Sequence, residues 1–245
     1  MLKIPDVFGR ATFFKKQDIG FNAGIGVKHT IGQAYNGMQV TTLHQLFFNA
    51  RFYTFAKEGA IGTIASIDLR VHHPDLMERT HRSKDRQLID DTNLEALDRE
   101  IKAAREIAGP DGYIAVNVMK AVDRFPELVK QACEGGANAI IMGAGLPFEL
   151  PDLTKDYPDV ALIPILSEER GVRAVLKRWL RKGVVPDAIV LEHPRYAGGH
   201  RGAPKPEYVH DEKCDLKRVL AEIPKVVVAL KIDPITLIPA GGVNS

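Results

Sequence analysis

The sequence predicts an α/β fold, a (β/α)8 TIM barrel that is truncated after its seventh strand. From about residue 56, short apolar runs alternate with longer amphipathic runs, a pattern typical of parallel strands joined by helices. No G-x-G-x-x-G motif follows an early strand, which argues against a doubly wound dinucleotide-binding domain. Polar residues that could carry chemistry follow several different strands, and in a barrel all of those strand ends meet at one mouth.

Six apolar runs are expected to form buried strands. They cover residues 60–66, 113–119, 138–143, 160–167, 187–192 and 235–242. A first strand is expected near "HTIGQ" (29–33), within a segment, residues 1–55, whose pattern is otherwise poor. We therefore expect a poorly matched N-terminal segment followed by the barrel portion, residues 56–245. The count reaches about seven strands, so we expect the eighth to be missing and the exposed edge to favour homo-oligomers.

Amphipathic runs between the strands are expected to form helices. They cover residues 92–108, 124–134, 169–182 and 212–222. In the first of them, apolar side chains recur at spacings of three and four, which defines one helix face: Leu94, Leu97, Ile101, Ala104 and Ile107. Thr92 is expected to cap this helix, and Gly109 with Pro110 to end it.

The stretch between residues 70 and 87 is polar and mostly basic. It carries His72, His73, Asp75, Glu78 and His81, which invite a metal interpretation. Their spacing fits no standard ligand set and basic residues interleave with them, so we expect no metal. A solvated loop is the favoured interpretation, and its place after a strand would suit a lid over the mouth.

Composition narrows the class of protein. The chain has 245 residues and a formal net charge of +2, too small to indicate binding to nucleic acid or to an anionic membrane surface. No apolar stretch approaches 18 residues, and the N-terminus lacks the pattern of a secretory signal. Its two cysteines, Cys133 and Cys214, suggest neither a disulfide framework nor a metal site. We therefore expect a cytoplasmic protein.

The segment "AGGHRG" (197–202) is the first candidate for chemistry, since it follows the strand expected at 187–192. Gly198, Gly199 and Gly202 would let backbone N–H groups approach a ligand closely. His200 would project among them, placed for proton transfer or for a hydrogen bond to developing charge. A surface turn with a solvated histidine explains the pattern equally well.

Other strand ends carry weaker signals. Gly241 and Gly242 follow the last strand and resemble half of a phosphate cradle, although a plain tight turn is the more common meaning. Asn117 lies near a strand end, where an amide can bind a heterocycle or satisfy nearby backbone. Gly143 permits close backbone approach after the next strand, and Ser167 ends the one after that.

From about residue 56 to the end, these segments resemble the nitronate monooxygenase family, formerly 2-nitropropane dioxygenases, whose members are FMN-dependent (β/α)8 barrels. The matching segments occur in the family's order: "KEGAIGTIAS", "REIAGPDGYIAVNVM", "NAIIMGAGLP", "IPILSEERGVRAVLKRW", "PDAIVLEHPRYAGGHRG" and "IPAGGVNS". The first 55 residues depart from the pattern. Only "IGQAYNGM" there is comparable with the family's opening flavin loop, and Gln33 is its candidate contact.

The resemblance implies roles for individual residues. His200 would lie beside the flavin as the catalytic base, and Gly241 with Gly242 would bind the FMN phosphate. Asn117 and Gly199 would line the flavin. The full set of residues predicted to bind the cofactor is Gln33, Asn117, Gly143, Ser167, Gly198, Gly199, Gly241 and Gly242.

The implied activity is oxidation of an alkyl nitronate by O2 to a carbonyl compound and nitrite, with His200 removing the α-proton when the substrate is the neutral nitroalkane. The cofactor would supply the electron transfer. Two alternatives remain open at this point. One is an FMN-dependent NAD(P)H reductase of enoyl thioesters or quinones, and the other is a truncated, non-catalytic fragment with weakened FMN binding.

Overall fold

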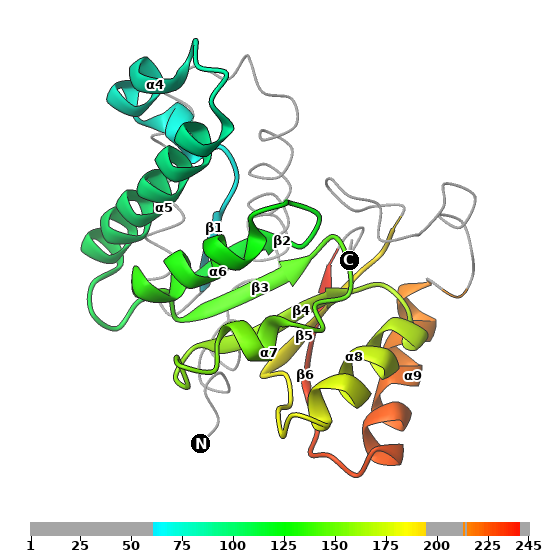
Figure 1. The fold of residues 1–245 in the computed structure, drawn as a ribbon. Helices are drawn as coiled ribbons and strands as arrows, with labels where there is room; N and C mark the ends of the chain where they lie inside the picture. The colour runs from blue at the N-terminus through cyan, green and yellow to red at the C-terminus, as the bar shows by residue number, and fades with distance from the viewer. Residues whose placement is uncertain (1–60, 195–212, 214, 241–245) are drawn as a thin grey trace.

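The computed structural model describes residues 61–194, 213 and 215–240. Short strands alternate with helices along this part of the chain (Figure 1). The strands are β1 (Ile61–Ala65), β2 (Tyr113–Met119), β3 (Ala139–Gly143), β4 (Ala161–Leu166), β5 (Ala188–Glu192) and β6 (Thr236–Ala240). The helices are η1 (Leu69–His72), α4 (Pro74–Thr80), α5 (Arg86–Ala108), α6 (Phe125–Glu134), α7 (Leu150–Leu153), α8 (Glu169–Leu180) and α9 (Leu216–Ala229).

The six described strands form a parallel sheet whose spatial order is the same as their order along the chain. A doubly wound sheet would reverse its strand order at a switch point, and this sheet does not. The described part of the chain is therefore a parallel β/α half-barrel, which agrees with the predicted alternation of parallel strands and helices. The strand expected near residues 29–33 lies outside the described residues.

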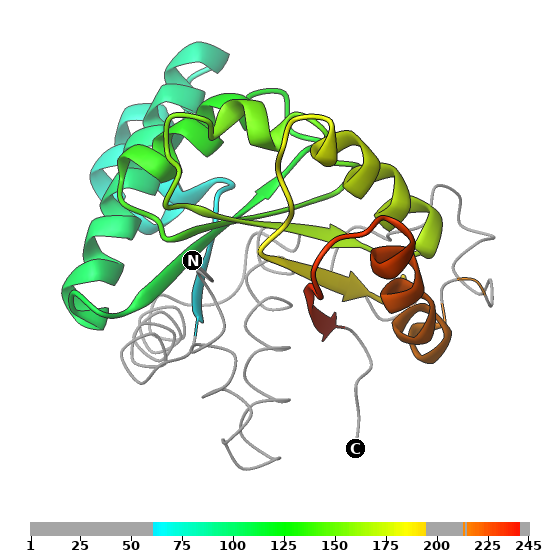
Figure 2. The same cartoon turned by 90° about the horizontal axis from the view of Figure 1, so that it is seen from below.

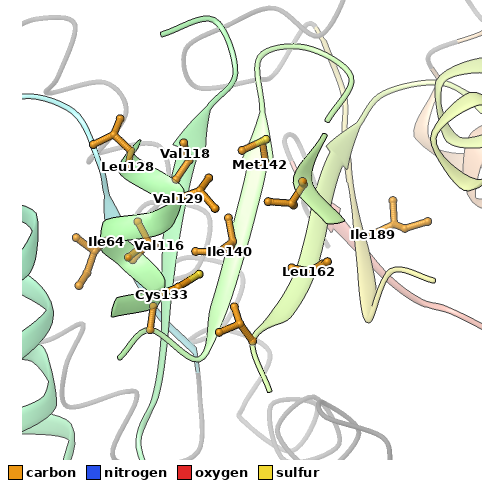
Figure 3. Packing of buried hydrophobic residues seen from close by; sticks show 14 of the residues in the cluster. Ile64, Val116, Val118, Leu128, Val129, Cys133, Ile140, Met142, Leu162 and Ile189 are labelled. Atoms are coloured by element: carbon orange, nitrogen blue, oxygen red, sulfur yellow. The ribbon is translucent and has the colours of Figure 1, made fainter. Parts of the chain in front are cut away.

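The two faces of the sheet have different neighbours. One face packs against the helices in a large core, seen edge-on in Figure 2 and close up in Figure 3. There Val116, Val118 and Ile140 lie against Leu128 and Val129 of α6. The other face carries a smaller cluster built only from strand residues: Ala115, Ala139, Ile141, Ala161, Ile163 and Ala188. Because side chains alternate along a strand, every second residue of β2 to β5 faces this side, which corresponds to the interior of a barrel.

Side chains at the amino ends of the strands fix the register of the sheet. The Oδ1 atom of Asn138 accepts hydrogen bonds from the Ile114 amide at 2.9 Å and from Arg105 Nη2 at 2.7 Å. Asp187, which directly precedes β5, has the same role: its Oδ2 atom accepts a hydrogen bond from the Leu162 amide at 2.8 Å. The contacts at the amino ends of the strands therefore stabilise the sheet, as is usual in β/α barrels.

Helix α5 begins six residues before its predicted start. Its N-cap is Asp85, whose carboxylate accepts a hydrogen bond from the Leu88 amide at 3.2 Å. The prediction that Thr92 caps this helix is wrong: Thr92 is buried inside it and donates its hydroxyl to the Leu88 carbonyl at 2.6 Å. Gly109, with φ of 75°, ends the helix as predicted. The predicted buried face is also shifted at its end, because Ile107 is 41% exposed.

The stretch predicted as a solvated loop instead folds into η1 and α4. Leu69 and Leu76 are buried on the core. Arg99 of α5 binds the Asp75 carboxylate through Nη1 at 2.8 and 3.0 Å, which ties α4 to α5. Burial of the two leucines in the core stabilises these helices although the segment is mostly polar. No local sequence pattern indicates this burial.

The last two helices also differ from prediction at their ends. Helix α8 stops at Leu180, two residues early, and Gly183 with φ of 71° follows in the turn. Helix α9 begins at Leu216 and continues through Pro224 to Ala229, seven residues past its predicted end. Val226 and Val227 are buried in the core, and their burial offsets the backbone hydrogen bond that proline removes. Among the described helices, none is both long and apolar enough to cross a bilayer.

Candidate functional site

Three predicted cofactor residues lie together at the carboxyl edge of neighbouring strands. Asn117 follows Ala115 by two residues on β2, and Gly143 follows Ile141 by two on β3. Ala115 and Ile141 belong to the interior-facing cluster, so strand alternation places Asn117 and Gly143 on the same face. The register pairs Asn117 with Ile141 and Met119 with Gly143. Ser167 directly follows the adjacent strand β4.

Two polar side chains of this edge, those of Asn117 and Ser167, lie in mostly buried residues. Asn117 is 6% exposed and Ser167 is 9% exposed, and neither side chain forms a hydrogen bond within the described part of the chain. Buried amides and hydroxyls are normally paired, because desolvating them without a partner costs free energy. The two side chains therefore offer hydrogen-bonding groups on the interior face of this edge.

Ser66, which the sequence analysis did not single out, lies at the same edge but on the other face of the sheet. It follows Ile64 of the helix-side core by two residues, whereas Ser167 follows Ile165 of the interior-facing cluster by two. Ser66 is 1% exposed, and its Oγ atom has no hydrogen-bond partner. Its amide donates to the Asn117 carbonyl at 3.1 Å, which fixes the end of β1 beside the end of β2.

Gly143 is required by close packing rather than by backbone angle. A Cβ atom at this position would lie 3.0 Å from Cδ1 and 3.1 Å from Cβ of Ile165. The side chain of Ile165, on the adjacent strand β4, therefore occupies the space that a side chain at position 143 would need.

The strands that lead into the two glycine-rich segments end at the same edge. Glu192 of β5 pairs in register with Ala240 of β6, and the His193 amide donates to the Ala240 carbonyl at 3.1 Å. The segments "AGGHRG" and "AGG" therefore follow the ends of two adjacent strands. The predicted site residues of those segments, together with the N-terminal candidate, lie outside the described residues: Gln33, Gly198, Gly199, His200, Gly241 and Gly242.

A cavity of about 290 Å³ opens beside this edge, on its helix side. Asp68 and Arg70 line it from the β1–η1 turn, Asn93 from α5 and Arg124 from the segment before α6. Both arginines are already neutralised: Arg70 Nε lies 2.7 Å from Asp68, and Arg124 Nη1 lies 2.8 Å from Asp91. The lining offers polar contacts and no unpaired positive charge for an anion.

The histidines of the 70–81 stretch form no metal centre in the described chain, since no group of three potential ligands occurs there. His73 Nε2 lies 3.2 Å from Glu100 Oε1 on α5 instead. Burial lowers the pKa of the neighbouring His72 below its ordinary value. The contact between His73 and Glu100 joins the η1–α4 segment to α5.

The comparisons agree with this architecture. The sequence model of the nitronate monooxygenase family matches residues 25–245. The structure of FabK from Thermotoga maritima superposes with a TM-score of 0.53 at 18% identity, covering 80% of this chain and 47% of that one. A nitroalkane oxidase from Streptomyces ansochromogenes gives a TM-score of 0.54 at 12% identity, covering 80% and 55%.

At these identities the structural likeness establishes the fold. The chain spans about half the length of both solved proteins. No curated protein sequence matches it. The family match covers most of the chain, including all of the strands of the parallel half-barrel. The chain belongs to the nitronate monooxygenase family.

Proposed function

We propose that this chain is the FMN-binding portion of an oxidoreductase that converts alkyl nitronates to carbonyl compounds and nitrite with O2. The observation that carries the proposal is the gathering of Asn117, Gly143 and Ser167 at the carboxyl edge, on the interior face of the sheet, beside the strand ends that lead into the two glycine-rich segments. Family membership supports an oxidoreductase, and the similar fold of a nitroalkane oxidase supports this substrate class.

The residues present fit a flavin. An isoalloxazine ring is flat and displays both hydrogen-bond donors and acceptors along one edge. The Asn117 side-chain amide can donate and accept at once, and the hydroxyl of Ser167 can do either. Gly143 would contact the cofactor through its backbone, because Ile165 fills the space beside its Cα atom. In this proposal residues 56–245 form the FMN-binding portion, and Gln33, Gly198, Gly199, Gly241 and Gly242 complete the cofactor contacts.

The chain's own residues have two tasks in this proposal. The carboxyl edge orients the cofactor, which supplies the electron transfer when it is bound. His200 removes the α-proton of a neutral nitroalkane, a task suited to an imidazole that titrates near neutrality. A substrate that arrives as the nitronate has already lost this proton, so it bypasses the histidine.

A flavin titration followed by anaerobic mixing tests the proposal. The purified chain should bind FMN and show an absorbance band near ~450 nm, and nitronate should bleach that band. Bleaching by NAD(P)H alone would identify a reductase instead. Failure to bind FMN would identify a non-catalytic fragment.

His200→Asn should reduce turnover of the neutral nitroalkane by roughly 10²–10⁴-fold and spare the nitronate. Equal losses on both substrates would contradict the role of this base.

A further inference from the structure

Three consecutive backbone carbonyls in the β3–α7 loop each accept a hydrogen bond from a different side chain. Lys120 Nζ donates to the Leu146 carbonyl at 2.9 Å. Trp179 Nε1 donates to the Pro147 carbonyl at 2.9 Å. Lys182 Nζ donates to the Phe148 carbonyl at 2.6 Å. We call this arrangement the carbonyl clamp.

The donors of the clamp are themselves anchored. Lys120 Nζ also binds Glu149 Oε2 at 2.5 Å, and Lys182 Nζ binds Asp152 Oδ2 at 2.6 Å. Trp179 is fully buried in the core through α8. Each lysine therefore joins a loop carbonyl to a carboxylate at or near the start of α7, which restrains the loop at both positions.

The loop needs this restraint because its backbone begins in an unfavourable conformation. Ala144 has φ of 54° and Gly145 has φ of 139°. A residue with a Cβ atom in the left-handed region is strained and persists only where the surroundings hold it. The stem of Lys120 packs here as well, since a Cβ on Gly145 would lie 3.2 Å from its Cδ atom.

Lys120 is the member of the clamp that belongs to the candidate site. It follows Asn117 by three residues, and its amide donates to the Gly143 carbonyl at 2.8 Å. Its backbone therefore joins the ends of β2 and β3, and its side chain fixes the loop that continues from Gly143. Trp179 of α8 and Lys182, which lies two residues past the end of that helix, hold the same loop from the helix side.

We propose that Lys120 is a positioning residue, which sets the shape of the β3–α7 loop as a wall of the ligand site and thereby sets ligand affinity. Its ammonium group acts on the loop and does not react. The ligand part of this inference rests on the proposed binding of FMN. The loop part rests on the contacts alone, so the two can be tested separately.

Lys120→Met is the informative variant, because methionine keeps most of the apolar stem and loses the donor. Lys120→Arg is the conservative rescue, since arginine can reach both the carbonyl and Glu149. Lys102→Met is the matched control: Lys102 pairs with Asp98 on the surface of α5 and is 67% exposed at its side chain. Far-UV circular dichroism of the three variants reports whether each one folds.

Hydrogen exchange of the peptide 143–153 measures the loop without any ligand. The Phe148 and Leu150 amides donate to the Leu146 and Pro147 carbonyls, respectively. Both amides should exchange about ten-fold faster in Lys120→Met than in the unaltered protein, and at the unaltered rate in Lys120→Arg and Lys102→Met. An unchanged rate in Lys120→Met would overturn the proposal.

FMN titration by fluorescence quenching measures the ligand part. Lys120→Met should raise the Kd by about ten-fold, and Lys120→Arg should restore most of the affinity. A faster loop with unchanged affinity would show a structural tether only and would overturn the assignment to the site. If the unaltered chain binds no FMN, the proposed function fails, and the exchange rates alone decide whether Lys120 holds the loop.

Discussion

Replacing Asn117 with leucine should stabilise the ligand-free protein and weaken its binding of FMN. Asn117 is 6% exposed, and its side-chain amide forms no hydrogen bond within the described residues, so the amide is largely removed from water with little compensation. A buried polar group in this state costs roughly 1–2 kcal/mol. Leucine has a similar volume and no polar atom, and its Cα partners Ala65 and Ile141 are apolar. The variant should therefore gain about 1–2 kcal/mol in the free energy of unfolding.

Urea denaturation of the ligand-free protein is the appropriate assay, with Trp179 as the only tryptophan in the sequence and hence a single fluorescent reporter. The midpoint should rise while the slope stays the same, and the melting temperature should rise by roughly 2–4 °C per kcal/mol for a chain of this size. The Kd for FMN should increase at least ~10-fold, because the leucine cannot replace the amide's hydrogen bonds.

Asn138→Leu is the matched control, since this asparagine lies at the opposite edge of the same sheet with its partners in place. Its Oδ1 atom accepts from Arg105 and from the Ile114 amide. Removing it should destabilise the protein by about 1–3 kcal/mol. A loss of stability in Asn117→Leu comparable to that in Asn138→Leu would show that Asn117 is a structural residue, and the reasoning would be refuted.

Two further outcomes follow from the packing and from the pKa of His72. Gly143→Ala should lower the free energy of unfolding, measured by urea denaturation, by about 1–3 kcal/mol, because the new Cβ atom would press on Ile165. Gly171→Ala is the control: its Cβ atom would have its nearest contact at 3.6 Å, so the change should be neutral or stabilising, and equal effects of the two substitutions would contradict the close approach at Gly143. Because burial lowers the pKa of His72 below 6.5, the unfolded chain binds the proton more readily, and stability should fall as the pH drops below about 6.5. Urea midpoints at about pH 5.5 and about pH 7.5 should differ less in His72→Asn than in the unaltered protein, and an identical difference would exclude this contribution.

The strands were predictable because their signal is local. Runs such as "AIIMG" and "ALIPIL" are continuously apolar, which is the signature of strands buried on both faces, and the described strands agree within one or two residues. Strand order followed from the same alternation, since successive right-handed crossovers place each strand beside the last.

Helix boundaries were less predictable because several residues could have served as caps. Asp85, Asp90, Asp91 and Thr92 are all acceptable N-caps by residue type, and only packing decides that Asp85 is used. Helix α4 was missed for a related reason. Its stability comes from burying Leu76 against distant residues, and the local sequence is too polar to indicate this.

The candidate site was partly predictable from strand ends alone. The positions of Asn117, Gly143 and Ser167 at one edge follow from parallel topology, which brings all carboxyl ends to one side. The carbonyl clamp could not be predicted. It joins Lys120 and Trp179 across distant stretches of sequence, and lysines and tryptophans carry no local signal for bonding to a particular carbonyl.

The central claim is that the carboxyl edge of the half-barrel binds FMN, and a nuclear magnetic resonance titration of the ligand-free chain with FMN tests it most directly. We expect the amide signals of Ser66, Asn117 and Ser167 and the side-chain amide of Asn117 to shift together. Signals from the amino edge, such as Ile114 and Leu162, should stay in place. Shifts confined to the amino edge or to the outer helices, or no shifts at saturating FMN, would contradict the account.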